Sequence, residues 1–226
     1  MKITAVIPVF NEKHSIGNLV LKAKQYCNDV IVVDDGSTDK TADILKTLGC
    51  KYVLHADNQG QGAATRTGVN VALRLGADII VTLDGDGQHS PDNIPLLLKP
   101  VLDNTADVVV GSRIAQLQGV PEYRKLGIDF ITWLYNVGSQ YKLSDSLLCL
   151  RVFKSEVLRN IQIEENRFGF CPEMLIKIRQ KGYRIKDIPI NCIYHDDYSL
   201  NSTYSPVRLG LILMRKTIKW RIKIEH

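Results

Sequence analysis

Residues 77–91, ADIIVTLDGDGQHSP, decide the fold, because a largely apolar run changes there into acids, glycines and other oxygen donors. The run Ile79–Leu83 is short and rich in β-branched side chains, which is typical of a strand buried on both faces. Asp84 and Asp86 follow it, and side chains two residues apart in an extended segment point the same way. The glycines beside them permit a tight turn and the close approach of a ligand. We therefore expect a buried strand that carries two carboxylates to one spot at its end.

The first half of the chain repeats this pattern of an apolar run that ends in polar residues. The predicted strands are KITAVIPVF (2–10), DVIVVDD (29–35), KYVLHAD (51–57), DIIVTLD (78–84) and DVVVGS (107–112), each expected to be buried on both faces. Between these strands, apolar residues recur at the spacing of a helix, which predicts helices over residues 15–27, 37–49, 62–76 and 90–103. Alternating strands and helices predict right-handed crossovers and a Rossmann-like α/β sandwich with a mostly parallel sheet flanked by helices. Such sheets bind ligands at their carboxyl edge.

The second half of the chain is less regular. Helices are predicted over residues 122–141 and 171–182, a strand over 184–195, and a mixed segment up to about Phe153. No stretch rich in Gly, Ser or Pro separates the halves, so we expect one domain over residues 1–226.

The last segment, residues 206–226, is basic and amphipathic. PVRLGLILMRKTIKWRIKIEH carries six Lys and Arg residues against the single acid Glu225. Two interpretations stay open. The helix can lie in a bilayer interface with Trp220 at headgroup depth, or it can pack on the domain with its charges solvated.

Composition narrows the class of protein. The chain has 226 residues, a net charge of +5 and five cysteines without a CxxC pair, which favours reduced thiols and argues against a zinc site. No apolar stretch approaches the roughly 20 residues that a membrane span needs. The first residues do not form a signal peptide. We expect a cytoplasmic protein, with peripheral contact to the cytoplasmic face of a membrane as an extension of that prediction.

Every predicted strand end carries polar residues that can bind a ligand: Phe10-Asn11-Glu12, Asp34-Asp35, Asp84 with Asp86 and Gln88, and Ser112-Arg113. Acids gathered at one sheet edge repel each other unless a cation lies among them. Hard oxygen ligands suit Mg²⁺ or Mn²⁺, usually with one or two carboxylates plus substrate phosphates. The alternative for Asp86 is a role in opening the turn after the strand.

Five motifs, in order and at these spacings, give the chain a family resemblance: VIPVFNE, IVVDDGSTDKT, NQGQGAATRTG, LDGDGQHSP and VVGSR. Together they resemble glycosyltransferase family 2 of the GT-A fold, in particular its polyprenyl-phosphate branch typified by dolichol-phosphate mannose synthase. The resemblance covers about residues 2–145 well and continues loosely through RFGFCPEMLIKIRQKGYRIKDIPI (167–190). It implies a nucleotide-sugar-binding half (1–113), an acceptor-side half (114–205) and the basic amphipathic helix (206–226).

The resemblance also implies roles for individual residues. The base and ribose of a nucleotide-sugar would lie near Pro8, Phe10, Glu12, Val33 and Asp35, with Asp84 and Gly85 against the ribose or pyrophosphate. Asp86 and Gln88 would hold the metal, Arg113 a phosphate, Arg124 the acceptor side, and Asp145 would lie near the reacting centre. Plainer alternatives remain: Phe10 as a core residue, Arg113 in a surface ion pair, and Asp145 as a helix or turn cap.

The implied activity is metal-dependent, inverting transfer of a sugar from a UDP- or GDP-linked donor to a polyprenyl or dolichyl phosphate. A regulatory module that binds the nucleotide-sugar without turnover is the main alternative. A sugar nucleotidyltransferase is less favoured, because PVFNEKHS lacks the glycine-rich loop expected after the first strand. Nucleic acid is not an expected partner, because no aromatic and basic stripe accompanies the positive charge.

The chain departs from the family pattern at four places. They are Gln61 in the glycine-rich stretch, Leu148-Cys149-Leu150 after Asp145, Cys171 before Pro172-Glu173, and His195-Asp196-Asp197 after the last strand, where Arg208 is a candidate substitute for missing basic residues. His89 has two interpretations, a spare metal ligand or a solvated loop residue.

Overall fold

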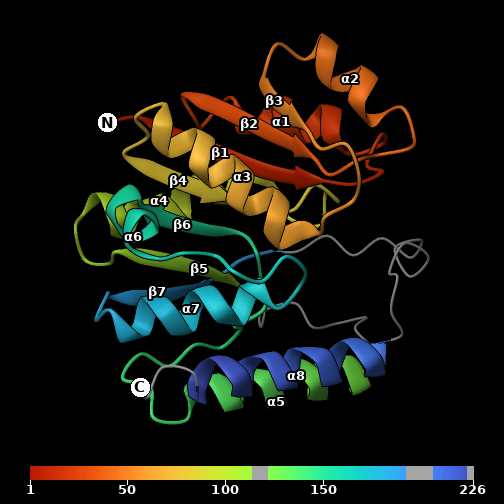
Figure 1. Ribbon diagram of the computed structural model, residues 1–226. Helices are drawn as coiled ribbons and strands as arrows, with labels where there is room; N and C mark the ends of the chain where they lie inside the picture. The colour runs from red at the N-terminus through yellow and green to blue at the C-terminus, as the bar shows by residue number, and fades with distance from the viewer. Residues whose placement is uncertain (114–121, 192–205, 223–226) are drawn as a thin grey trace.

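The computed structural model describes residues 1–113, 122–191 and 206–222, and it shows one seven-stranded sheet (Figure 1). In spatial order the strands are β3 (Lys51–Leu54), β2 (Asp29–Asp34), β1 (Ile3–Val9), β4 (Ile79–Thr82), β6 (Arg151–Lys154), β5 (Val108–Ser112) and β7 (Ile185–Pro189). All neighbouring pairs are parallel except those of β6, which is antiparallel to both β4 and β5. The mostly parallel α/β sheet predicted from the sequence is confirmed.

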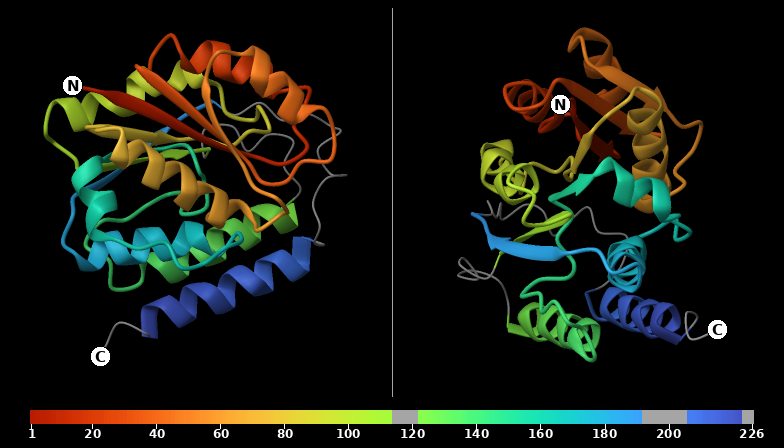
Figure 2. Two further views of the ribbon diagram at one scale, coloured as in Figure 1. Left: turned by 45° about the horizontal axis from the view of Figure 1, so that its top comes forward. Right: turned by 90° about the vertical axis from the view of Figure 1, so that its left-hand side faces the viewer.

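Helices lie on both faces of this sheet (Figures 1 and 2). They are α1 (Ile16–Ala23), α2 (Thr41–Thr47), α3 (Gln61–Arg74), α4 (Ile94–Leu102) after the 3-10 turn η1 (Pro91–Asn93), α5 (Glu122–Asn136), α6 (Ser155–Asn160), α7 (Phe170–Gln180) and α8 (Pro206–Ile222). The predicted helices are present with shorter bounds. Helix α6 and strand β6 were not predicted, because they are only six and four residues long and too short for a clear periodic pattern.

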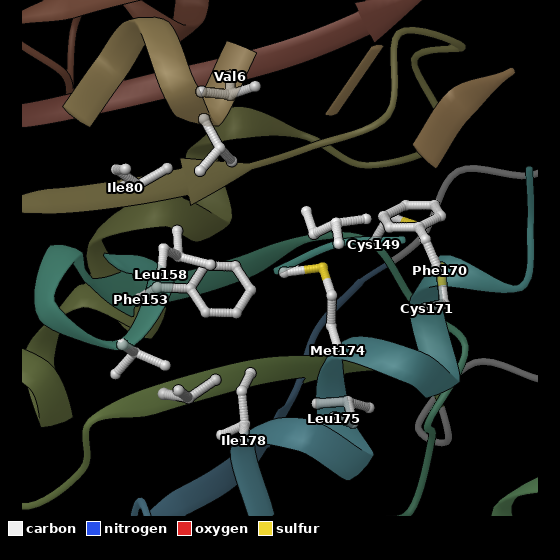
Figure 3. Packing of buried hydrophobic residues seen from close by; sticks show 14 of the residues in the cluster. Val6, Ile80, Cys149, Phe153, Leu158, Phe170, Cys171, Met174, Leu175 and Ile178 are labelled. Atoms are coloured by element: carbon white, nitrogen blue, oxygen red, sulfur yellow. The ribbon is translucent and has the colours of Figure 1, made fainter. Parts of the chain in front are cut away.

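Two apolar clusters hold the layers together, one on each face of the sheet. The first joins the sheet to α1 and α4, and the second joins it to α3, α6 and α7. Figure 3 shows the second, where Phe153 of β6 lies near Met174 and Ile178 of α7. Because β6 supplies a side chain to each cluster, Val152 to one and Phe153 to the other, this short strand is fixed from both sides.

The prediction that all five first-half strands are buried on both faces is wrong for residues 51–57. This strand ends at Leu54, and the side chains of Tyr52 and Leu54 are exposed. The reason is its position, because β3 is the edge strand and pairs only with β2.

Helix α8 packs against α5 and α7, and this decides between the two interpretations of Trp220. The indole is 1% exposed, and its Nε1 donates a hydrogen bond to Oε1 of Glu165 at 3.3 Å. The ammonium groups of Lys177 and Lys219 lie 4.2 and 4.7 Å from the ring centroid. The interpretation with Trp220 at headgroup depth is therefore wrong, since this side chain belongs to the interior. In the described parts of the chain, no helix combines the length and apolar character needed to cross a bilayer.

Asp107, just before β5, ties three strands together. Its carboxylate accepts hydrogen bonds from Nε and Nη2 of Arg184 at 3.0 and 2.8 Å and from Nζ of Lys154 at 2.8 Å. These bonds, those from the Arg184 side chain foremost, hold the pKa of Asp107 well below its ordinary value. A carboxylate with a lowered pKa in the folded state adds stability above its unfolded pKa of about 3.9 and loses it as the pH falls below that value.

We predict that Asp107→Asn lowers the free energy of unfolding at pH 7 by about 1–3 kcal/mol, because charged hydrogen bonds are lost. The stability of the variant should also fall less steeply than that of the natural chain as the pH drops below about 4. Urea unfolding at pH 7, 4 and 3 measures both effects. The control is Asp103→Asn, which removes an exposed ion pair with Lys99 and should change stability by about 0–1 kcal/mol. Equal losses in the two variants would contradict the assignment.

Candidate active site

The loop after β4 presses against the end of β1, and this contact forms the centre of the site. A Cβ atom at Gly85 would lie 2.4 Å from Cγ1 of Val9 and 3.0 Å from the carbonyl oxygen of Pro8. Ser15 adds a link, since its Oγ lies 2.7 Å from the Gly85 carbonyl oxygen and 3.0 Å from Oε2 of Glu12. The acids that follow β1 and β4 in the sequence therefore share one space at the carboxyl edge.

These acids lie where their negative charge is disfavoured. Burial raises the pKa of Glu12 to about 7. A hydrogen bond from Ser15 lowers this pKa, and repulsion from Asp86 and Asp39 raises it further. Burial and the charge of Asp86 likewise raise the pKa of Asp84 to about 7. A cation at this spot would relieve the repulsion.

Asp84 has three neutral neighbours. Nε2 of Gln61 donates a hydrogen bond to its Oδ1, the thiol of Cys149 is a further hydrogen-bond partner, and Nε2 of His89 lies 3.8 Å from its Oδ2. His89 is buried, so its interpretation as a solvated loop residue is wrong. Burial and the nearby charge of Arg113 lower the pKa of His89 to about 4, which leaves the ring neutral at pH 7.

Arg113, directly after β5, forms an ion pair through two hydrogen bonds with Asp145, which lies in the segment before β6. Nε of Arg113 donates to Oδ2 of Asp145 at 2.5 Å, and Nη2 donates to Oδ1 at 3.2 Å. Asp145 is buried, so the alternative of a surface ion pair for Arg113 is wrong. Oδ1 of Asp145 also accepts a hydrogen bond from the backbone of Leu147 at 3.0 Å, which is the turn-capping role considered from the sequence. The pair fixes the guanidinium plane at the edge of the site.

Arg151 is a buried cation near the acids that was not predicted from the sequence. Its guanidinium donates to the carbonyl oxygens of Leu148, Ser146 and Cys171 at 2.7, 3.0 and 3.1 Å. Register places Arg151 opposite Thr82 of β4 and opposite Val110 of β5. No local pattern marks this role, because it depends on the antiparallel strand β6.

Gln61, Cys149 and Cys171, three of the residues that depart from the family pattern, lie together beside Asp84. Sγ of Cys149 lies 3.1 Å from Sγ of Cys171 and 3.7 Å from Nε2 of Gln61. Both cysteines are free thiols, and the pKa of Cys149 is raised well above its ordinary value by its hydrogen bond with Cys171 and by burial. Figure 3 shows the two cysteines beside Phe170. Asp84 is therefore flanked on this side by neutral groups.

The remaining predicted binding residues take different positions. Phe10 is 43% exposed just after β1, so its alternative as a core residue is wrong. Both carboxylate oxygens of Asp35 are engaged by His55 and by the backbone of the loop before α3, through Gln59 and Gly60. Val33 lies fully buried in the second apolar cluster, with its side chain against Gly68 of α3.

Two further predictions fall on parts that the structure does not describe. Arg124 lies in the first turn of α5, but its side chain is outside the described residues. His195, Asp196 and Asp197 are also outside them.

The residues at the acidic edge suit a divalent ion that arrives with a diphosphate. Among the described residues, no group of three or more His, Cys, Asp or Glu side chains is arranged to hold a metal by itself. Asp86 and Gln88 offer a carboxylate and an amide oxygen, and Mg²⁺ commonly takes one or two carboxylates and completes its shell with phosphate and water. Oδ1 of Asp86 also accepts a hydrogen bond from the Gln88 backbone at 2.9 Å, so the turn-opening role exists beside any metal role.

Comparison with known proteins identifies the family. The family model "Glycosyl transferase family 2" matches residues 4–161 of this chain. The chain belongs to glycosyltransferase family 2. It is 36% identical to the UDP-N-acetylglucosamine–dolichyl-phosphate N-acetylglucosaminyltransferase of Methanococcus voltae, over 86% of each chain. It is 32% identical to the undecaprenyl-phosphate mannosyltransferase of Micrococcus luteus, over 85% of this chain and 84% of that one.

Solved structures show the fold. Glucosyl-3-phosphoglycerate synthase from Mycobacterium tuberculosis, crystallised with Mn²⁺, uridine diphosphate and phosphoglyceric acid, matches with a TM-score of 0.73 and 20% identity, over 98% of this chain and 78% of that chain. The resemblance to the polyprenyl-phosphate branch and the GT-A fold predicted from the motifs are both confirmed. This family 2 chain is a glycosyltransferase enzyme.

We predict that Gly85→Ala lowers the free energy of unfolding by about 1–3 kcal/mol, because the added methyl group overlaps Val9. The same displacement should weaken binding at the acidic edge. Denaturant unfolding measures the first effect, and titration with uridine diphosphate and Mn²⁺ measures the second. The control is Gly17→Ala in α1, where a Cβ meets nothing within 4 Å and should stabilise the helix by about 0.5–1 kcal/mol. A Gly85 variant as stable as the Gly17 variant would refute the close contact of Gly85 with Val9.

Proposed function

We propose that this family 2 glycosyltransferase moves a sugar, with inversion, from a UDP- or GDP-linked donor to a polyprenyl or dolichyl phosphate. The observation that carries the proposal is the convergence of Asp84, Asp86 and Arg113 at the carboxyl edge of the parallel strands. The names of the two relatives described above, both transferases to a lipid phosphate, support the acceptor class.

The donor would bind along the ends of β1, β2 and β4. Exposed Phe10 offers a flat apolar surface to a nucleotide base, and Asp35 lies close by, since its backbone N–H donates to the carbonyl oxygen of Val9 at 2.8 Å. Gly85 packs closely on Val9 and Pro8 of β1, and without a side chain it would let a ribose or pyrophosphate approach its backbone.

Asp86 and Gln88 would hold Mg²⁺ or Mn²⁺ together with the donor diphosphate. When bound, such an ion neutralises the charge that develops on the leaving diphosphate. The raised pKa of Asp84 and Glu12 supports this proposal, because both carboxylates lie where a positive charge relieves repulsion.

Arg113 would bind a phosphate with its guanidinium already oriented by Asp145. Asp145 then acts as a positioning residue, since its oxygens are occupied by Arg113 and by the Leu147 backbone. Arg124 would lie on the acceptor side. A phosphate monoester, whose second pKa is about 6, is largely ionised at neutral pH, so the acceptor oxygen needs little help from a base.

We predict that Asp86→Ala weakens binding of uridine diphosphate in the presence of Mn²⁺ by at least ~10-fold, since even outer partners of a metal site contribute about 10–100-fold. Calorimetric titration with and without Mn²⁺ measures this, and circular dichroism checks the fold. Asp43→Ala is the control, because Asp43 is an exposed acid on α2 that pairs with Lys46 and lies outside the predicted site. Unchanged metal-dependent affinity in the Asp86 variant would refute the metal assignment.

Turnover separates the transferase from a module that only binds. The full chain with Mn²⁺ should release nucleoside diphosphate from a UDP- or GDP-sugar only when a short polyprenyl phosphate is added. Tight donor binding without release, across the whole panel of donors, would overturn the proposed function.

A further inference from the structure

Helix α5 presents an exposed apolar stripe. Leu126, Phe130, Trp133 and Val137, which follows the last turn, are 69%, 47%, 59% and 40% exposed. Their spacing of four, three and four residues puts them on one side of the helix. The rings of Phe130 and Trp133 are stacked, with centroids 5.8 Å apart. Large apolar side chains gathered in this way mark a surface that meets a partner.

Helix α8 carries a second stripe in which apolar and basic side chains alternate. Leu211, Ile218 and Ile222 are exposed, and the exposed Arg208 and Arg215 lie at matching helical positions. The opposite side of α8, with Leu213, Thr217 and Trp220, is buried. One side of α8 therefore packs on the protein, and the other side faces the solvent.

The two helices lie side by side and run in the same direction along one end of the molecule (Figures 1 and 2). Their first turns lie on the side towards which β1 and β4 point, so the stripes begin near the edge of the site (Figure 1). We name their exposed residues the α5–α8 face: Leu126, Phe130, Trp133 and Val137 with Leu211, Arg215, Ile218 and Ile222.

The charges around this face fit an anionic surface. The described part of α8 contains no acid, and its Lys216 and Lys219 are paired with Glu165 on the packed side. On α5 the exposed acid near the stripe is Asp129, beside the half-buried Lys125. Aromatic and aliphatic side chains interleaved with arginine are typical of helices that lie at the boundary between lipid headgroups and acyl chains.

We propose that the α5–α8 face docks the protein on an anionic lipid bilayer, with Phe130 and Trp133 at headgroup depth and Arg215 against lipid phosphates. This inference rests on the proposed function, because a transferase that uses a polyprenyl phosphate has to reach its acceptor in a membrane. The anchor differs from the one considered from the sequence: Trp133 takes the place of the buried Trp220.

The test is sedimentation of the full chain with vesicles of phosphatidylcholine, with and without phosphatidylglycerol. The natural chain should bind the anionic vesicles. The double variant Phe130→Ser/Trp133→Ser should bind at least ~10-fold more weakly, since each ring loses its place in the interface. Arg215→Glu should weaken binding by about fivefold or more, and the loss should shrink as salt is raised. Leu21→Ser in α1 is the control, because Leu21 is 58% exposed and lies on another helix.

Fluorescence gives a second readout. Addition of anionic vesicles should shift the tryptophan emission of the natural chain to shorter wavelength, and Trp133→Phe should abolish the shift while vesicle binding is retained. Urea unfolding of each variant shows that the fold is kept.

The inference would be overturned if the natural chain did not bind anionic vesicles, or if the double variant bound them equally well. It would also be overturned if the natural chain were a dimer and the double variant a monomer, because the face would then be a contact between two copies. The proposed function fails separately. If docking through this face is found but no sugar reaches a short, water-soluble polyprenyl phosphate, the inference stands and the function falls. If that transfer occurs without docking, the function stands and the inference falls.

Discussion

Repulsion among carboxylates at one edge of the sheet is the constraint on which the site depends. Parallel strands deliver Glu12, Asp84 and Asp86 to the same place, and burial makes their charge costly, as the raised pKa of Glu12 and Asp84 shows. The cations nearby are already engaged: Arg113 with Asp145, and Arg151 with three carbonyl oxygens. A positive charge placed at the acidic edge would therefore relieve this repulsion.

The antiparallel strand β6 supplies the other side of this arrangement. Because β6 runs against β4 and β5, it begins at the edge where they end, and the chain before it reaches the site. Asp145 and Cys149 arrive by this route. Arg151 then holds the segment in place through the carbonyl oxygens of Ser146 and Leu148. A buried guanidinium with its hydrogen bonds satisfied is tolerated, and it fixes a loop that has no helix or strand of its own.

A continuous set of contacts also joins helix α8 to the acidic edge of the sheet. Lys216, Lys219 and Trp220 of α8 bind the side chain of Glu165, and the next carbonyl, of Asn166, accepts a hydrogen bond from the backbone of Ala63 in the first turn of α3. The glycines at 60 and 62 make this approach possible, since a Cβ at either would lie within 2.4 Å of a backbone oxygen. The same turn carries Gln61 to Asp84. The buried side of α8 therefore supports the site through Glu165 and α3, while its other side stays exposed.

The sequence by itself determined the parallel strands, the acids at their ends and the family, because strand periodicity, chain direction and short motifs are local properties. It did not determine β6, the burial of His89, the cation Arg151, or the meeting of Gln61, Cys149 and Cys171, because each depends on segments brought together from distant parts of the chain. Trp220 and Trp133 show the difference most directly. An amphipathic pattern indicates that a helix has an apolar side, but only the packing of α8 on α5 and α7 decides which apolar side is covered and which remains exposed to solvent.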